Sequence, residues 1–186
     1  LQEEYIDFLK GLFKGSQPSR YIALAYLTGI LPIKRTMTQS ALNNFDEYTM
    51  LNPGPLASFI GFTEEEVKRL SDTYNIDFNR IKKWYDGYYL NHQHVYNPKA
   101  VVSLFTLGVF QSSSYESINS LIQMNFDGLK EAVLEMLSGN EVKMQTTSFQ
   151  NDMVSFKNKN DVLTALVHLG YLGYNQTYKT VFIPNE

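Results

Sequence analysis

The 186-residue sequence contains no cysteine, which excludes disulfide bonds and thiolate zinc sites and fits the reducing cytoplasm, where we expect the protein. No stretch approaches ~18 consecutive apolar residues, so we expect no transmembrane helix and no membrane partner. The sequence also lacks a G-x-x-x-x-G-K-[ST] motif and any apolar strand that ends in paired acidic residues. These absences exclude a complete P-loop nucleotide site within the chain, so no cofactor is expected for the chain itself.

Positive charge is scarce as well. Lysine and arginine number 16 against 19 acidic residues, which gives a net charge of −3, and no long basic run occurs. A sequence-independent grip on a phosphate backbone needs clustered positive charge, so the charge does not support nucleic acid as a partner. Aromatic residues are abundant by contrast, with 13 tyrosines, 12 phenylalanines and one tryptophan.

An apolar run from residue 21 to residue 30 is the strongest single pattern, and it predicts a strand buried on both faces. Thr28-Gly29 is the polar end of the strand expected over residues 21–27, the place where α/β proteins put ligand contacts. The Thr28 hydroxyl could contact a terminal phosphate or orient an attacking water, or Thr28-Gly29 could simply be a turn. Lys34 and Arg35 come next; they could offset phosphate charge, although solvated loop cations are commoner.

The rest of the sequence predicts a mainly α protein with a few short strands, an α+β fold that divides near residues 110–115 or 140–150. Thr63 and Glu66 form a capping-box pattern, and Asn97-Pro98 is a typical helix start. We expect helices over residues 3–14, 38–43, 62–72, 77–84, from 97 onward, 116–124, 127–138 (capped by Asp127) and from 160 onward, with a hairpin over 87–96 and strands at 171–175 and 179–183.

A helix followed directly by a hairpin, as expected after residue 160, is the outline of a winged helix. Base readout by such a helix needs Arg, Lys, Asn or Gln side chains. Residues 161–170 offer only Asp161, Thr164 and His168, so we favour a packing role for this element.

Two further groups of residues are candidate functional sites. Trp84-Tyr85-Asp86-Gly87-Tyr88 is dense in aromatic rings; we favour a turn at Asp86 and rings wedged between subdomains over a catalytic carboxylate. His92 and His94 lie two residues apart and would share one face of a strand, as metal ligands can. They fall at the expected turn without an evident third ligand, so we favour a chance pair and expect no metal site.

Seven sequence blocks follow one another along the chain: Leu27 to Ile33, Ser40 to Phe45, Gly61 to Val67, Trp84 to Tyr88, Tyr96 to Pro98, His168 to Leu172 and Ile183 to Glu186. In this order they make the chain resemble the bacterial AAA-ATPase-like proteins that carry a PD-(D/E)XK nuclease-like domain at their C-terminus. The structural motif residues of the resemblance include Asn43, Trp84 to Tyr88 and Asn97-Pro98. One departure is Ser114-Tyr115-Glu116, where a Tyr-Trp pair is typical of the family.

The resemblance implies that the intact protein has an ATPase half before this chain, a nuclease-like domain after it, and ATP and Mg²⁺ as cofactors. It implies a division into an ATPase-core remnant (1–35), a helical lid-like region (36–140) and a winged-helix-like connector (141–186). The chain would then be a non-catalytic segment that couples nucleotide state to the nuclease-like domain. The alternative is a binding module for nucleic acid or protein without nucleotide dependence.

Overall fold

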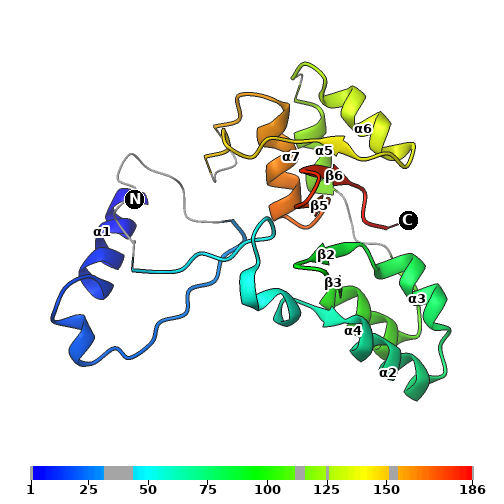
Figure 1. The fold of residues 1–186 in the computed structure, drawn as a ribbon, viewed down its shortest axis with the longest axis horizontal. Coiled ribbons are helices and arrows are strands. Elements are labelled where there is room, and N and C mark those ends of the chain that lie inside the picture. Colours follow the sequence, from blue (N-terminus) through cyan, green and yellow to red (C-terminus); the bar gives the residue numbers. More distant parts are fainter. Residues whose placement is uncertain (1, 32–43, 112–115, 125, 151–154, 186) are drawn as a thin grey trace.

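The computed structural model describes residues 2–31, 44–111, 116–124, 126–150 and 155–185. Figure 1 shows helices combined with two small antiparallel sheets, each of three strands. The fold is therefore mixed α/β, which agrees with the expected helices and short strands at that level. Within the described ranges, every helix is too short or too polar to cross a bilayer.

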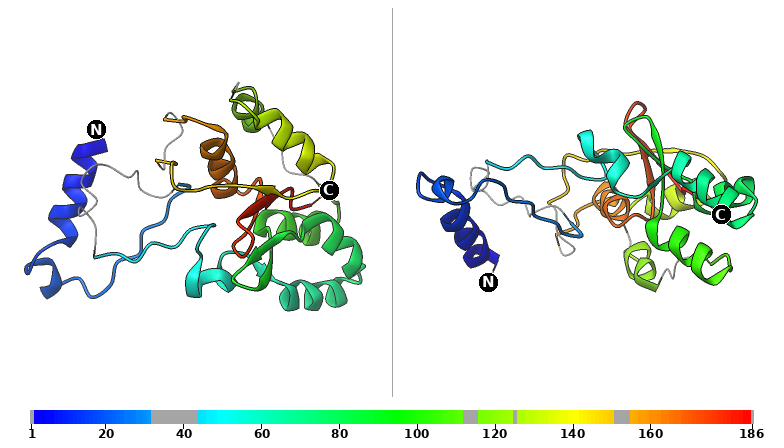
Figure 2. Two further views of the ribbon diagram at one scale, coloured as in Figure 1. Left: turned by 45° about the horizontal axis from the view of Figure 1, so that its top comes forward. Right: turned by 90° about the horizontal axis from the view of Figure 1, so that it is seen from below.

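The N-terminal part lies to one side of the other elements in all three ribbon views (Figures 1 and 2). It contains α1 (Gln2–Phe13), as the sequence predicts, and a 3-10 turn η1 (Pro18–Arg20). It contacts residues 44 and 45 through Phe13: the Asn44 side-chain amide donates to the Phe13 carbonyl at 3.2 Å, and the Phe45 ring meets the Phe13 ring edge-on.

The strand expected over residues 21–30 is not formed, and this prediction was wrong for the chain as described. These residues carry no strand pairing, and most of their side chains are exposed, Leu24 at 88%. A strand exists only beside a partner that accepts and donates its ladder hydrogen bonds. No described segment lies in that position, so the apolar pattern has no sheet to join. The helix expected at 38–43 lies outside the described residues.

We call residues 54–111 the first lobe. Its elements are η2 (Gly54–Phe59), β1 (Phe62–Thr63), α2 (Glu64–Tyr74), α3 (Phe78–Tyr85), β2 (Tyr88–Leu90), β3 (Gln93–Tyr96) and α4 (Pro98–Leu107). The strands form an antiparallel sheet in the order β1-β3-β2, with Phe62 opposite Tyr96 and Tyr88 opposite Val95. The hairpin turns at Asn91 and His92, both with positive φ.

Local sequence signals set the helix ends in this lobe. The Thr63 hydroxyl accepts from the Glu66 backbone N–H while the Glu66 carboxylate accepts from the Thr63 N–H, so the predicted capping box is confirmed. The Asn97 side chain accepts from the Ala100 N–H ahead of Pro98, as predicted. α2, α3 and α4 bury their apolar faces in one core with β3, made of Val67, Ile81, Tyr85, Tyr96, Val101 and Leu104.

We call the described residues between 116 and 185 the second lobe. Its elements are α5 (Glu116–Ile122), α6 (Leu129–Leu137), β4 (Val142–Lys143), α7 (Lys159–His168), β5 (Gly173–Asn175) and β6 (Thr180–Phe182). Its sheet has the order β4-β6-β5. The predicted helix and hairpin are α7 with β5 and β6. β4, which turns the hairpin into a three-stranded sheet, was not foreseen.

Two helix starts in the second lobe differ from the prediction. α6 begins after Gly128, and Asp127 does not cap it. α7 begins at Lys159, because the Asn158 side chain accepts from the N–H groups of Asn160 and Asp161. Every residue of α7 from Asp161 to Val167 is buried, so this helix forms the centre of the lobe.

The two lobes meet along β2 and β5. The Tyr88 hydroxyl donates to the Gly170 carbonyl. Just ahead of the first lobe, the Leu51 carbonyl accepts from the Gln176 side-chain amide. Gly87 adopts a φ of +149°, and a β-carbon there would lie 1.8 Å from the Pro184 carbonyl oxygen. Only glycine allows this approach of the two backbones.

The two apolar cores divide the chain between α4 and α5, because α6 shares its core with α7 and β6 rather than with α2 to α4. The division at residue 140 implied by the family resemblance stays a prediction about domains, and the cores of the described residues divide the chain at a different place.

Candidate functional site

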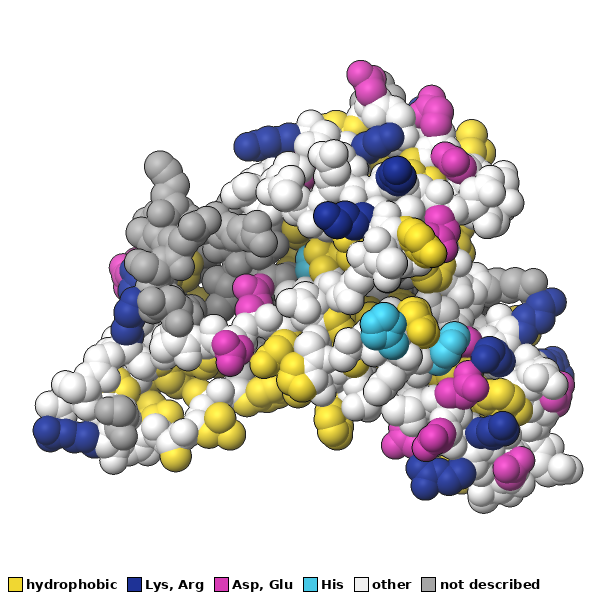
Figure 3. Space-filling model, in the orientation of Figure 1, with side chains coloured by type: hydrophobic (Ala, Val, Ile, Leu, Met, Phe, Trp, Pro, Cys, Tyr) yellow, Lys and Arg dark blue, Asp and Glu magenta, His cyan; other side chains and the backbone are white. Residues whose placement is uncertain are grey.

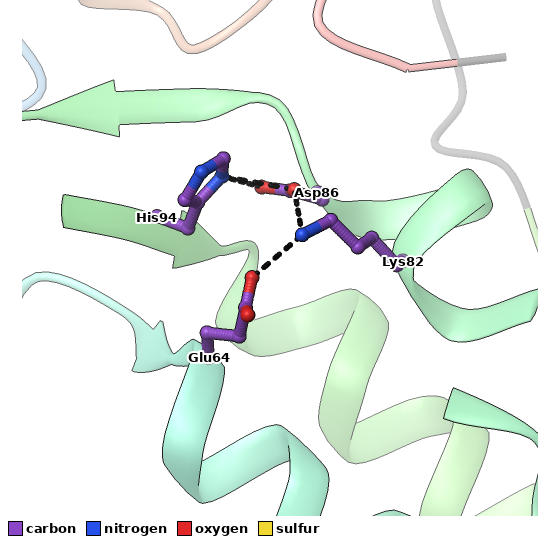
Figure 4. A network of polar contacts seen from close by, with 4 residues as sticks. All are labelled: Glu64, Lys82, Asp86 and His94. Atoms are coloured by element: carbon purple, nitrogen blue, oxygen red, sulfur yellow. Dashed lines mark hydrogen bonds and ion pairs between the residues drawn. The ribbon is translucent and has the colours of Figure 1, made fainter. Parts of the chain in front are cut away.

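Four polar side chains meet at one end of the first-lobe sheet, next to the junction between the lobes (Figure 4). Glu64 is the first residue of α2, Lys82 lies in the last turn of α3, and Asp86 follows α3 directly. His94 lies on β3. We call these four residues the Asp86 cluster.

Asp86 lies at the centre of the cluster and is its most buried member, with a side chain 11% exposed. Its carboxylate oxygens lie 2.9 and 3.0 Å from His94 Nδ1. Lys82 Nζ lies 2.8 Å from Glu64 Oε2 and 3.8 Å from Asp86 Oδ2, so the ammonium bridges two carboxylates that would otherwise repel one another.

The cluster changes the proton affinities of two of its members. The hydrogen bond from Lys82 lowers the pKa of the Glu64 carboxyl, against the opposing effect of its partial burial. The same hydrogen bond raises the pKa of the Lys82 ammonium. Both side chains are more than a third exposed, so solvent screening keeps the contribution of this pair to stability small.

Tyr96 lies beneath the cluster. It is two residues beyond His94 on β3, and side chains at this spacing point to the same face of a strand. Tyr96 is fully buried, and its hydroxyl is the one buried side-chain N or O atom without a hydrogen-bond partner among the described residues. Burial raises the pKa of this hydroxyl far above its usual range, and the charges of Asp86 and Glu64 raise it further.

A shallow, open depression beside the cluster reaches from the first lobe to the end of the second. Figure 3 shows histidine, acidic and basic side chains gathered on this face of the first lobe. The depression is lined by Lys82, Lys83, Asp86, Gly87, Tyr89, His94, Phe182 and Pro184. Its walls thus come from both lobes, with charge on one side and apolar surface on the other.

The sequence predicts a turn at Asp86 and shows no second acid or base at a telling spacing from it. The structure places Glu64 and His94 close to Asp86 in space, although they are 22 and 8 residues away in sequence. His94 belongs to the cluster but His92 lies in the turn, where its ring meets the edge of Tyr89. The i,i+4 spacing of Lys82 and Asp86 on a helix was a signal that could have revealed this pair. No local signal pointed to Glu64.

The other family-motif residues have structural positions. The Trp84 and Tyr85 rings both pack against Phe110 within the first lobe, so they do not separate the lobes as the wedge prediction proposed. Tyr85 also accepts from the Gln111 N–H at 2.9 Å. Tyr88 is the ring of the motif that reaches the second lobe.

The nucleotide-sensing candidates are not brought together by the described structure. Thr28 lies exposed in the irregular segment after η1. Lys34 and Arg35, as well as the family-motif residue Asn43, lie outside the described residues. The sensor role of Thr28 stays a prediction.

Comparison with known proteins gives little further. No family model matches the chain, and no solved structure matches it. Over 120 residues the chain is 26% identical to a protein of Azotobacter chroococcum mcd 1 described as "Uncharacterized protein in vnfD 5'region". The match covers 63% of this chain but 23% of that relative, so the matched region spans about a quarter of the relative's length.

Proposed function

We propose that the chain is a non-catalytic connecting segment of an AAA-ATPase-like protein, and that it couples the nucleotide state of an ATPase core to a downstream nuclease-like domain. The observation that carries the proposal is the apolar segment after η1. Its largest side chains lie exposed, among them Leu24, Tyr26 and Ile30 (Figure 3). An apolar surface of this kind requires cover from another protein surface.

The proposed cover is the parallel sheet of the ATPase core, because the segment has the composition of a strand buried on both faces. Thr28 would then lie at the carboxyl end of the strand, beside the phosphates of ATP held with Mg²⁺ by residues of that core. The Azotobacter relative supports the proposal only by being longer than this chain, since most of its sequence lies beyond the matched region.

The junction between the lobes provides a route for coupling. Movement of the first lobe would pass to the second through the Tyr88–Gly170 hydrogen bond and the tight Gly87–Pro184 approach. One contact joins the Tyr88 ring to the Gly170 backbone, and the other brings the Gly87 and Pro184 backbones together. Sliding of one lobe past the other would break both contacts.

The test is ATP turnover by the longer protein that the proposal implies, with Thr28→Ala as the variant. We expect turnover to fall by at least about tenfold, since a group that positions the attacking water is lost. Thr73→Ala is the matched control, because Thr73 is an exposed threonine on α2 and its loss should leave turnover unchanged. Equal turnover in the wild type and Thr28→Ala would remove the sensor assignment.

Calorimetry on the chain alone separates the proposal from a nucleotide-independent binding module. With ATP and Mg²⁺ we expect no binding, because the phosphate-binding loop is absent from the sequence. Clear binding would contradict the proposal. Retardation of short DNA duplexes by the chain at moderate salt would instead favour a nucleic-acid-binding module.

A further inference from the structure

The donor atoms of the Asp86 cluster lie close enough together to hold a metal ion. One atom each from Glu64, Asp86 and His94 lies within 4.8 Å of the others. Two ligand atoms bound to a tetrahedral zinc at about 2.1 Å lie about 3.4 Å apart, so the three side chains must draw together by about an ångström to coordinate one ion.

The buried Tyr96 hydroxyl is a second and independent sign of a ligand. Leaving a buried hydroxyl without a hydrogen bond costs about 1–3 kcal/mol, and native proteins keep few such groups. Carboxylates that bind a metal through one oxygen commonly accept a hydrogen bond at the other. A Glu64 carboxylate turned towards a metal would offer its second oxygen to this hydroxyl.

From these observations we propose that Glu64, Asp86 and His94 bind a zinc ion, with Tyr96 as the outer hydrogen-bond donor to Glu64. One imidazole nitrogen and two carboxylate oxygens form a ligand set that zinc accepts, with water at the fourth position. Calcium and magnesium prefer sites made of oxygen alone, which this cluster is not.

Existing contacts occupy the same place. The Lys82 ammonium lies 2.8 Å from Glu64 and 3.8 Å from Asp86, and His94 Nδ1 lies 2.9 Å from Asp86 Oδ2 (Figure 4). Zinc would replace these contacts, because Nδ1 must be without a proton to coordinate and Lys82 must turn outward. The Lys82 side chain is 40% exposed and reaches solvent, so this movement is open to it.

The ion would join three elements at the edge of the lobe junction: the start of α2, the end of α3 and strand β3. Asp86 precedes Gly87, whose backbone lies against Pro184 of the second lobe. Bound zinc would therefore stiffen the part of the first lobe that touches the second. This inference does not depend on the proposed coupling to an ATPase.

The experiment is isothermal titration of the 186-residue chain with zinc chloride in a chelator-free buffer. We expect one zinc ion per chain, with His94→Ala binding at least tenfold more weakly. His92→Ala is the matched control, since His92 is an exposed histidine two residues away and outside the cluster. Its affinity should equal that of the wild type.

Two further variants test the geometry. Lys82→Gln removes the competing charge, so zinc should bind several-fold more tightly, while Lys99→Gln removes a charge from α4 and should change nothing. Tyr96→Phe should weaken binding about tenfold by removing the outer hydrogen bond. Far-UV circular dichroism checks the fold of each variant, and Glu64→Gln replaces His94→Ala if the latter does not fold.

Several outcomes would overturn the proposal. These are the absence of zinc binding in both the wild type and Lys82→Gln, equal affinity in His94→Ala and His92→Ala, or binding unchanged by Glu64→Gln. Calcium bound as tightly as zinc would also contradict it, because the histidine would then contribute nothing.

Discussion

Two apolar stretches of this chain have similar sequences and opposite surroundings. Residues 21–30 lie extended and exposed, whereas residues 162–167 of α7 lie buried in the middle of the second lobe. Composition separates them only slightly: both are apolar runs with a single threonine, and residues 21–30 also contain Tyr21, Tyr26 and Gly29. They differ in their neighbours: α7 is covered by α5, α6 and β6, and no described element covers the first run.

The comparison teaches that an apolar run predicts burial but does not say which surface provides it. For α7 the cover lies within 45 residues on either side in sequence, in elements with strong signals of their own. For residues 21–30, the predicted sheet has no counterpart among the described residues. The next four predictions test how far this difference holds.

The largest effect is expected from truncating one leucine in each run. Leu163→Ala should lower the free energy of unfolding by about 2–5 kcal/mol, because Leu163 is fully buried and its loss leaves a cavity. Leu24→Ala should change it by less than about 0.5 kcal/mol, since Leu24 is exposed. Urea unfolding followed by circular dichroism measures both. A large loss in Leu24→Ala would mean that residues 21–30 are buried in solution, and the contrast would disappear.

Sequence reasoning succeeded where the signal is local. The capping box of Thr63 and Glu66 and the Asn97-Pro98 start are confirmed, because each needs only the backbone groups of the next turn. The hairpin over 87–96 is confirmed for the same reason, with its turn at Asn91-His92. Asp127 failed as a cap because Gly128, with positive φ, takes the position before α6.

Sequence reasoning failed where the contacting residues are distant in sequence. The short strands β1 and β4 contain two residues each, too few to show an alternating pattern, and they form only because β3 and β6 offer free edges. The Asp86 cluster was missed for a related reason. Glu64 comes beside Asp86 because α2 and α3 pack together, and no local spacing records that contact.

A glycine at the lobe junction should give the next largest effect. Gly87→Ala should cost about 3 kcal/mol, because its β-carbon would overlap the Pro184 carbonyl and its φ of +149° is strained for alanine. Gly108→Ala is the control with positive φ but open space, and about 1 kcal/mol is expected. Thermal unfolding compares the two, and equal losses would show that the lobes are not held together at Gly87.

A smaller change is expected at the start of α2. Thr63→Ala removes one side of the capping box and should lower the free energy of unfolding by about 1 kcal/mol. Thr73→Ala, on the same helix, should have no measurable cost, because the Thr73 hydroxyl bonds only a carbonyl of its own helix. The measurement is the urea midpoint of unfolding of the two variants under the same conditions. No difference between the two variants would mean that α2 does not depend on its cap.

Acid should produce the smallest effect. The pKa of Glu64 is lowered in the folded state by Lys82, and that of Glu66 is lowered by its hydrogen bonds to Thr63. A lowered folded pKa stabilises the fold above the ordinary glutamate pKa of 4.5, and this stabilisation is lost as pH falls below it.

The measurement is the urea midpoint between pH 7 and pH 3. We expect the decline in Lys82→Gln to be shallower than in the wild type, since Glu64 then has no ammonium partner. Lys99→Gln, with the same change in net charge, should follow the wild type. A steeper decline in Lys82→Gln would contradict the assigned cause.

The contacts between the lobes also constrain the order in which the chain can fold as it is synthesised. Residues 54–111 contain all the buried residues of their main core, so this lobe can fold once it has left the ribosome. Tyr88 cannot form its hydrogen bond until Gly170, 82 residues later, has been synthesised. Leu51 likewise cannot accept its hydrogen bond before Gln176, 125 residues later, is present. During that interval the edge strand β2 and the Gly87 backbone remain open to other chains, so the nascent protein is most prone to mispairing before residue 184 emerges.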